Sequence, residues 1–243
     1  MKQKYYNNIF LIIFALTLLL LTYLIYYYIY NYNTALKIHT YLISLPIDIE
    51  RRKNFEKYYK DKYEYFEAVN GNELKHTSIF KDWGCLDPDK QSHVGTKALQ
   101  LTTSKVFEDA LNKNYDWIVI FQDDAEPPEG FNINNIKEII KKYSDSLIIY
   151  LDNRNPEGDG VIPDCCLSGM IYHKYVFKIL ANELNPEKGT YLQNYGNKDK
   201  KIMNHNDCLH DWFLANLIAE NGFKTSSAPL VYSGRFDSRI STT

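Results

Sequence analysis

The run from Trp117 to Phe121 is a short apolar, partly β-branched segment that ends in Gln122, Asp123 and Asp124. Such a segment is typical of a buried central strand, and strands of this kind present functional groups at their carboxyl ends. Two adjacent acids after a buried strand repel each other unless a cation or hydrogen-bond donors compensate, and carboxylate oxygens suit Mg²⁺ and Mn²⁺. The pattern therefore indicates a cation site, with a solvated acidic turn as the alternative reading.

Strand-like and helix-like segments alternate along most of the chain. Strands are expected at 38–45, 63–69, from Trp117, at 146–151 and at 167–172, and helices after Asp48 and at 96–112, 134–143, 176–184 and 207–220. The polar stretch 185–206 has little to bury and is expected to form a mobile loop. This alternation predicts an α/β fold with a mostly parallel sheet and helices on both faces.

The N-terminal segment from Ile9 to Tyr30 contains no charged residue. It is long enough to cross a bilayer as a helix, whereas the core of a signal peptide has about 7–15 residues. Lys2 and Lys4 precede it, and a tyrosine cluster that suits a membrane interface overlaps its end. The expected organisation is a cytoplasmic tail (1–8), a transmembrane signal anchor (9–30), a stalk (31–37) and a folded domain (38–243).

This organisation predicts a single-pass type II membrane protein whose domain 38–243 lies in the lumen of the ER or Golgi, or in an equivalent compartment. A cleaved signal peptide, processed near Thr34-Ala35, is the alternative. The chain has 28 basic and 30 acidic residues, so no general basic field is available to hold a polyanion, and nucleic acid is not expected as a partner. Its four cysteines are too few and too irregular for structural zinc, and leave open a disulfide or buried thiols.

Several short blocks stand in a fixed order from about residue 38 to the end of the chain. They are Tyr41-Leu42-Ile43-Ser44-Leu45-Pro46-Ile47-Asp48-Ile49-Glu50-Arg51-Arg52, Phe66-Glu67-Ala68-Val69-Asn70-Gly71, the helix opening at Gly95, Asp123-Asp124-Ala125, Ser168-Gly169-Met170-Ile171-Tyr172, His210-Asp211-Trp212-Phe213-Leu214 and Pro229-Leu230-Val231. Their order and spacing resemble glycosyltransferase family 25, which contains lipooligosaccharide and collagen-hydroxylysine galactosyltransferases. The resemblance implies a Rossmann-like fold of the GT-A type, and a hexosyltransferase that uses a UDP-sugar.

Two positions depart from the pattern of the family. Thr102-Thr103 stand where the family has Ser-His, and Gln122 replaces the leading acid of Glu-Asp-Asp. On a strand, Gln122 and Asp124 would point to the same face and Asp123 to the other. A neutral oxygen at Gln122 would weaken a metal site there, although it could still bind a ribose hydroxyl. Loss of activity therefore remains open, which would leave a degenerate GT-A-fold module for adhesion or glycan binding.

The resemblance also implies roles for particular residues. Transfer from a UDP-sugar releases a diphosphate, whose growing charge a carboxylate-bound Mn²⁺ or Mg²⁺ can neutralise. We expect Asp124, supported by Asp123 and with His210 completing the shell, to hold the metal. The edge of the sheet beyond the strand ends should receive the nucleotide. The residues expected to bind it there are Ser44, Arg51, Arg52, Gln122 and Asp123.

The family resembles inverting enzymes, in which a carboxylate removes the proton of the acceptor hydroxyl while that oxygen attacks the anomeric carbon. Asp211 is the expected base. Asp207 lies four residues earlier on the same helical face, and either supports it or caps the helix. The expected acceptor is a hydroxyl of a glycan or glycoprotein. A metal-dependent phosphohydrolase using Asp123-Asp124 is a weaker alternative, because it leaves the first two blocks unexplained.

Overall fold

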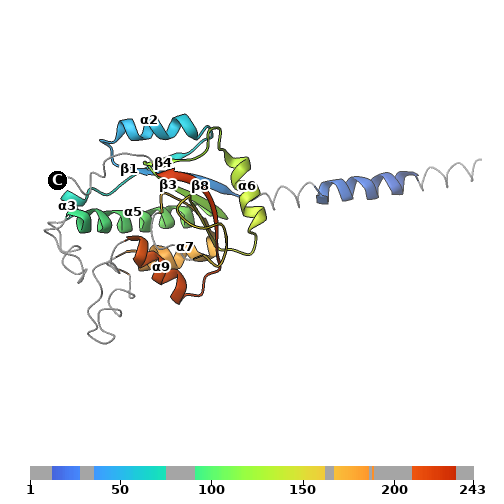
Figure 1. The fold of residues 1–243 in the computed structure, drawn as a ribbon. Helices are drawn as coiled ribbons and strands as arrows, with labels where there is room; N and C mark the ends of the chain where they lie inside the picture. Colours follow the sequence, from blue (N-terminus) through green and yellow to red (C-terminus); the bar gives the residue numbers. More distant parts are fainter. Residues whose placement is uncertain are drawn as a thin grey trace, which may run out of the picture. The chain divides into compact units, whose positions relative to one another are not determined.

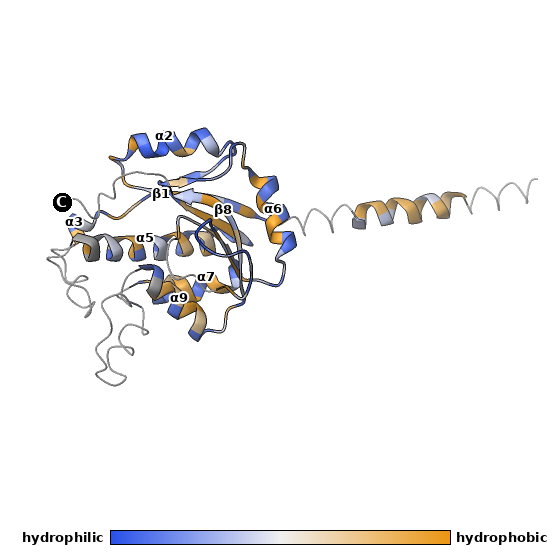
Figure 2. Ribbon diagram, in the orientation of Figure 1, coloured by the Kyte–Doolittle hydropathy of each residue, from blue (hydrophilic) through white to orange (hydrophobic). Residues whose placement is uncertain are grey.

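The computed structural model describes residues 13–27, 36–74, 91–161, 167–185, 188 and 210–233. The chain divides into two compact units, Met1–Lys37 and Ile38–Thr243. The N-terminal unit contains a helix at 13–27 whose leucine, isoleucine, phenylalanine and tyrosine side chains are exposed, and which is mostly orange in Figure 2. Among the residues described, no helix is both long and apolar enough to cross a membrane. The remainder of the expected anchor 9–30 lies outside the described residues.

The unit 38–243 is built on one mixed sheet with helices on both of its faces (Figure 1). Its strands are β1 (Ile38–Ser44), β2 (Glu64–Glu67), β3 (Trp117–Gln122), β4 (Ala125–Glu126), β5 (Ile148–Asp152), β6 (Gly158–Asp159), β7 (Gly169–His173) and β8 (Thr225–Ser233). The order across the sheet is β2-β1-β3-β7-β5-β8-β4, and β6 pairs with β8. The helices are α2 (Ile49–Tyr58), α3 (Gly71–Leu74), α5 (Gln91–Lys113), α6 (Ile133–Lys142), α7 (Lys174–Glu183) and α9 (His210–Glu220).

The prediction of a mostly parallel sheet was wrong. β1 runs parallel to β2 and β3, and β5 runs parallel to β8, but β7 lies between β3 and β5 and is antiparallel to both. β4 and β6 are also antiparallel to β8. Adjacent parallel strands need a long crossover, usually a helix. The described residues between β5 and β7 contain only the short strand β6, so β7 returns in the opposite direction.

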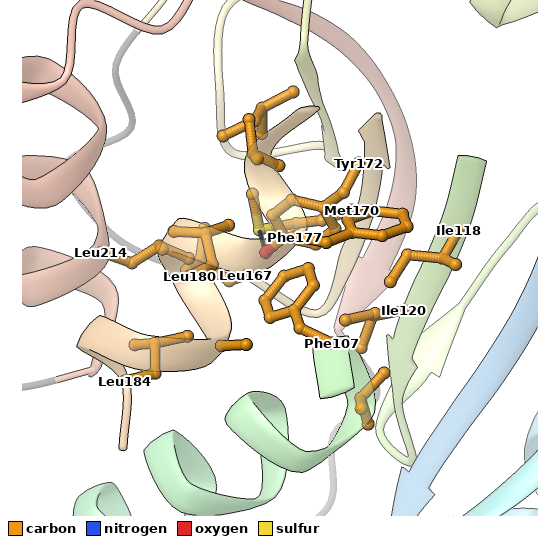
Figure 3. Close-up of a cluster of buried hydrophobic side chains, with 14 of the residues drawn as sticks. Phe107, Ile118, Ile120, Leu167, Met170, Tyr172, Phe177, Leu180, Leu184 and Leu214 are labelled. Atoms are coloured by element: carbon orange, nitrogen blue, oxygen red, sulfur yellow. Dashed lines mark hydrogen bonds between the residues drawn. The ribbon is translucent and has the colours of Figure 1, made fainter. Parts of the chain in front are cut away.

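The alternation of the central strands sends side chains into two separate cores. Val119 and Phe121 of β3 face α2 and α6, where they pack with Phe55 and Ile136. Ile118 and Ile120 face the opposite side and pack against α5, α7 and α9. Figure 3 shows the second core, in which the Phe107 ring packs against Phe177 and lies nearly perpendicular to the ring of Tyr172. A strand buried on both faces explains why β3 has an uninterrupted apolar sequence.

Most expected elements appear within a few residues of their predicted bounds, and the largest difference is at α5, which begins at Gln91 instead of residue 96. Asp48 occupies the N-cap position of α2, but its side chain makes no capping hydrogen bond. Gly222 follows α9 with φ of 62°, as expected for a glycine that ends a helix. Within the expected mobile loop 185–206, only residues 185 and 188 are described.

Gly169, the first residue of β7, leaves no room for a side chain. A Cβ built there would lie 3.1 Å from two ring atoms of Phe121 and 3.3 Å from Val231. The Phe121 ring is itself enclosed by Phe55, Tyr59 and Phe131, so it has little freedom to move. We expect Gly169→Ala to lower the free energy of unfolding by about 1–3 kcal/mol, measured by urea denaturation.

Phe121→Leu provides the matched test of this steric explanation. In the double variant, the smaller side chain should recover part of the loss caused by Gly169→Ala, giving a coupling energy between the two sites. Strictly additive effects would contradict the proposed contact.

Candidate functional site

The polar residues of the domain converge at the edge where β1, β3 and β5 end. Ser44 is the last residue of β1, Asp123 follows β3, and Asp152 is the last residue of β5. Because β7 is antiparallel, its beginning lies at the same edge, and the Ser168 carbonyl accepts a hydrogen bond from the backbone N–H of Gln122 at 2.9 Å. The ends of β1, β3 and β5 and the beginning of β7 thus meet at one edge of the sheet.

Asp123 forms the centre of a buried hydrogen-bonded group. The Ser44 hydroxyl donates to its Oδ2 at 2.7 Å, and Nη1 of Arg51, in the first turn of α2, donates to its Oδ1 at 3.2 Å. Burial raises the pKa of Asp123, while the bonds from Ser44 and the charge of Arg51 oppose this effect. The structure therefore brings together three of the residues expected to bind the nucleotide.

Arg52, the next residue of α2, binds the turn between β1 and α2. Its guanidinium donates to Ser44 Oγ at 3.2 Å and to the carbonyls of Leu45 and Pro46 at 2.5 and 3.0 Å. It also lies over the ring of Tyr65, 4.7 Å from the centroid. Much of its hydrogen-bonding capacity thus holds the turn between β1 and α2, so its present role is to fix the position of Ser44.

Asp124 is less well compensated than its neighbour. In the described part of the chain its Oδ1 is inaccessible to solvent and has no hydrogen-bond partner. Burial and the adjacent Asp123 raise its pKa to about 6, against the opposing charges of Arg51 and Arg154. A buried carboxylate oxygen without a donor is a costly arrangement, and an added cation would relieve it.

The expected metal ligands are only partly brought together. The donor set of Asp123 and Asp124 suits a hard cation, and the unpartnered oxygen of Asp124 is the feature that fits one best. Among the described residues, however, no three His, Cys, Asp or Glu side chains are grouped so as to hold a metal. His210 lies in a different place, at the start of α9, where it lines a cavity with Gln122 and Thr103.

That cavity, on the α5, α7 and α9 face, has a volume of about 10 Å³ and brings the two departures from the family pattern into one place. Gln122 Nε2 donates to the Leu167 carbonyl at 3.1 Å, and Thr103 donates to the Leu99 carbonyl at 2.8 Å. Nδ1 of His210 is buried and has no partner among the described residues, and burial lowers the pKa of this histidine.

The expectation that Gln122 and Asp124 share one face rested on continued strand geometry. Residues 123–124 instead form a turn between β3 and β4, so the alternation of the strand ends at Gln122. Gln122 lines the small cavity, whereas Asp123 binds Ser44 and Arg51 on the α2 side. Gln122 and Thr103, the two departures from the family pattern, therefore line a cavity on one side of the sheet, and the carboxylate of Asp123 lies on the other side.

The expected acid–base residues fall in or near α9. Asp211 is half-buried in the first turn of that helix. Burial raises the pKa of Tyr172, and the charge of Asp211 adds to this effect. Asp207 lies outside the described residues.

Sequence reasoning missed the pair Asp152 and Arg154. Arg154 donates from Nε and Nη2 to the two carboxylate oxygens of the fully buried Asp152 at 2.7 and 2.6 Å. Burial alone would raise the pKa of Asp152, but the hydrogen bonds from Arg154 and Ser168 outweigh it and leave that pKa below its ordinary value. The available signal was an acid at the end of an apolar strand, the same pattern that identified Asp123.

The fold and this polar edge define an α/β domain of the kind that binds ligands beyond the ends of its strands. Residues 37–157 match the model of glycosyltransferase family 25, described as an LPS biosynthesis protein family. This segment of the chain therefore belongs to glycosyltransferase family 25, which confirms the resemblance noted in the sequence and supports glycosyl transfer in general. The blocks from Ser168 onward lie beyond the matched segment.

Three solved structures are similar to the chain at low identity. A glycosyltransferase involved in glycosylation of the major capsid of PBCV-1 is 12% identical, with a TM-score of 0.42, over 83% of this chain and 94% of that one. A197 from STIV is 9% identical, with a TM-score of 0.42, over 81% and 83%. Mouse xyloside xylosyltransferase 1 in its apo form is 9% identical, with a TM-score of 0.47, over 79% and 84%. No curated protein matches the sequence.

The raised pKa of Asp124 predicts a pH-dependent effect on stability. An aspartate whose pKa rises from 3.8 to about 6 on folding holds its proton more tightly in the folded state. The free energy of unfolding therefore falls as the pH rises between these values. In buffer with EDTA, Asp124→Asn should raise the free energy of unfolding at pH 7 by about 1–2 kcal/mol, after allowance for partial exposure, and by little at pH 3.5.

Urea denaturation at both pH values measures this effect. Glu129→Gln, at an exposed acid of the following loop, serves as the matched control and should change stability little at either pH. An equal gain for Asp124→Asn at pH 3.5 and pH 7 would rule out ionisation as its cause.

Proposed function

We propose that the domain transfers a hexose, galactose or glucose, from a UDP-sugar to a hydroxyl of a glycan or glycoprotein, with inversion and with the help of Mn²⁺ or Mg²⁺. The observation that carries this proposal is the group of Ser44, Arg51 and Asp123 next to Asp124, whose Oδ1 is buried, inside the segment that matches the family. We assign to the domain a GT-A type of fold, in which the nucleotide lies beyond the ends of the strands.

In this proposal the residues of β1 and α2 bind the donor. Ser44 presents its hydroxyl at the end of β1, where it is held between Arg52 and Asp123. Arg51 places a positive charge beside the aspartates and so favours a nearby phosphate. Asp123 orients both groups through its two oxygens. Gln122, whose amide donates to the Leu167 carbonyl, would contribute to ribose binding only if it releases that bond.

Asp124, with Asp123, would hold the divalent cation, which supplies positive charge to the departing diphosphate. His210 lines the small cavity with Gln122 and Thr103. It would therefore reach this cation only if α9 shifted. Asp211, on the same helix, is proposed to accept the proton of the acceptor hydroxyl, with Asp207 as its support.

Release of UDP tests this function directly. The chain should release UDP from UDP-galactose or UDP-glucose in the presence of Mn²⁺ and an acceptor glycan, and EDTA should suppress the release. Asp124→Ala should lower the rate about 10²-fold or more, because the leaving group then loses its charge stabilisation. Glu129→Ala, at an exposed acid of the following loop, is the matched control.

Retained turnover in Asp124→Ala would overturn the assignment of the metal site.

The second candidate function is a glycan-binding or adhesion module without catalysis, favoured by Gln122 and Thr103, whose polar groups are bound to backbone carbonyls. Glycan binding without UDP release from any UDP-sugar would support this module.

We also propose that the N-terminal segment 9–30 anchors the protein in a membrane as a single-pass type II signal anchor, with the domain in the lumen of the ER or Golgi or an equivalent compartment. The exposed apolar side chains on helix 13–27 support this proposal.

Extraction with alkaline carbonate tests the anchor on the full chain. Replacing Leu19 and Leu20 together with arginine should move the protein from the membrane pellet to the supernatant, because each charge near the centre of a span costs about 2.5–3.5 kcal/mol. Leu36→Arg, beyond the proposed span, should leave the distribution unchanged. A doubly substituted protein that still pellets would contradict the anchor.

A further inference from the structure

The chain segment after β5 holds an arginine in a fixed position at the edge of the sheet. Arg154 binds both carboxylate oxygens of Asp152 through Nε and Nη2, and its backbone N–H donates to Oδ1 of the same carboxylate at 3.0 Å. Ser168 donates to Oδ2 at 2.5 Å. The Asp152 carboxylate is therefore fully engaged, and the planar guanidinium has one defined orientation.

The two members of this ion pair differ sharply in exposure. The side chain of Asp152 is 1% exposed, whereas that of Arg154 is 44% exposed. Nη2 of Arg154 also donates to Ser233, the last residue of β8, at 2.8 Å. A buried ion pair adds little to stability compared with apolar residues of similar size. What this pair does provide is a positive charge held at the surface by Asp152 of β5 and Ser233 of β8.

Arg154 lies at the same edge of the sheet as the aspartates. β5 is separated from β3 only by β7. Ser168, which precedes β7, donates from its hydroxyl to Asp152 and accepts at its carbonyl from the backbone N–H of Gln122. Ser233, to which Arg154 donates, pairs with Ala125 of β4, the residue that follows Asp124. Arg154 is therefore linked to the turn that carries the aspartates through a single residue pair of the sheet.

We infer that Arg154 is a phosphate-binding residue of the donor site, held in place by Asp152 and Ser233, and that it contacts the diphosphate of the nucleotide sugar. This inference rests on the proposed function. A fixed guanidinium at the same edge of the sheet as the aspartates offers a phosphate a charged donor with little cost of ordering the side chain. As the leaving group gains charge, the arginine stabilises it together with the cation.

Titration calorimetry of the full chain with UDP and with uridine, both in the presence of Mn²⁺, tests the inference. Arg154→Ala should weaken UDP binding about 10- to 100-fold, the usual effect of a lost hydrogen bond to a charged group, while uridine affinity changes less than about twofold. Lys174→Ala is the matched control. It removes an ion pair of similar length, 2.7 Å to Asp116, at the opposite end of β7, and should leave both affinities unchanged.

Arg154→Gln provides a second variant if the alanine variant fails to fold, since the amide can still donate to Asp152 but carries no charge. It should show the same selective loss for UDP. Equal losses for UDP and uridine, or no loss for either, would overturn the inference and leave Arg154 a structural residue. If the unsubstituted chain binds no UDP, the proposed donor class fails as well, whereas normal UDP binding with an unaffected Arg154→Gln variant removes only the inference.

Discussion

The bond between Ser44 and Asp123, reinforced by Arg51, is the interaction on which the candidate site depends. It joins the ends of β1 and β3 to the first turn of α2, and it satisfies both oxygens of a carboxylate that is almost buried. Burial without such donors would cost several kcal/mol or force protonation. Asp123 is compensated in this way, but Asp124 is not, because its buried Oδ1 has no donor among the described residues.

The sheet divides the polar residues of this edge between two environments. Asp123, Ser44 and Arg51 form a connected hydrogen-bonded group on the side of α2. Gln122 and His210 line a small cavity on the side of α5 and α9. Replacement of the family's glutamate by Gln122 therefore changes the second environment and leaves the first intact. The hydrogen-bonded group around Asp123, which we propose binds the donor, therefore contains neither of the two departures from the family pattern.

The secondary structure was largely predictable because its signals are local. The apolar run before Asp123, the turn at Pro46 and the glycine after α9 each define an element by composition or backbone freedom, and β1, β3, α6 and α9 appear close to their predicted places. The direction of β7 was not predictable in this way. Its sequence is equally compatible with parallel and antiparallel pairing, and the choice depends on how the connection from β5 returns to the sheet.

The sequence by itself determined the family, the approximate elements and the position of the acids at the end of the central strand, because motif order and apolar periodicity depend on neighbouring residues. Tertiary structure alone decided which distant groups meet. It paired Asp123 with Ser44 and Arg51, separated Gln122 and His210 from that group, and joined Arg154 to Ser233 across β5 and β8. These contacts follow from strand order and from the turn at residues 123–124, which are properties of the packed chain and not of any single segment.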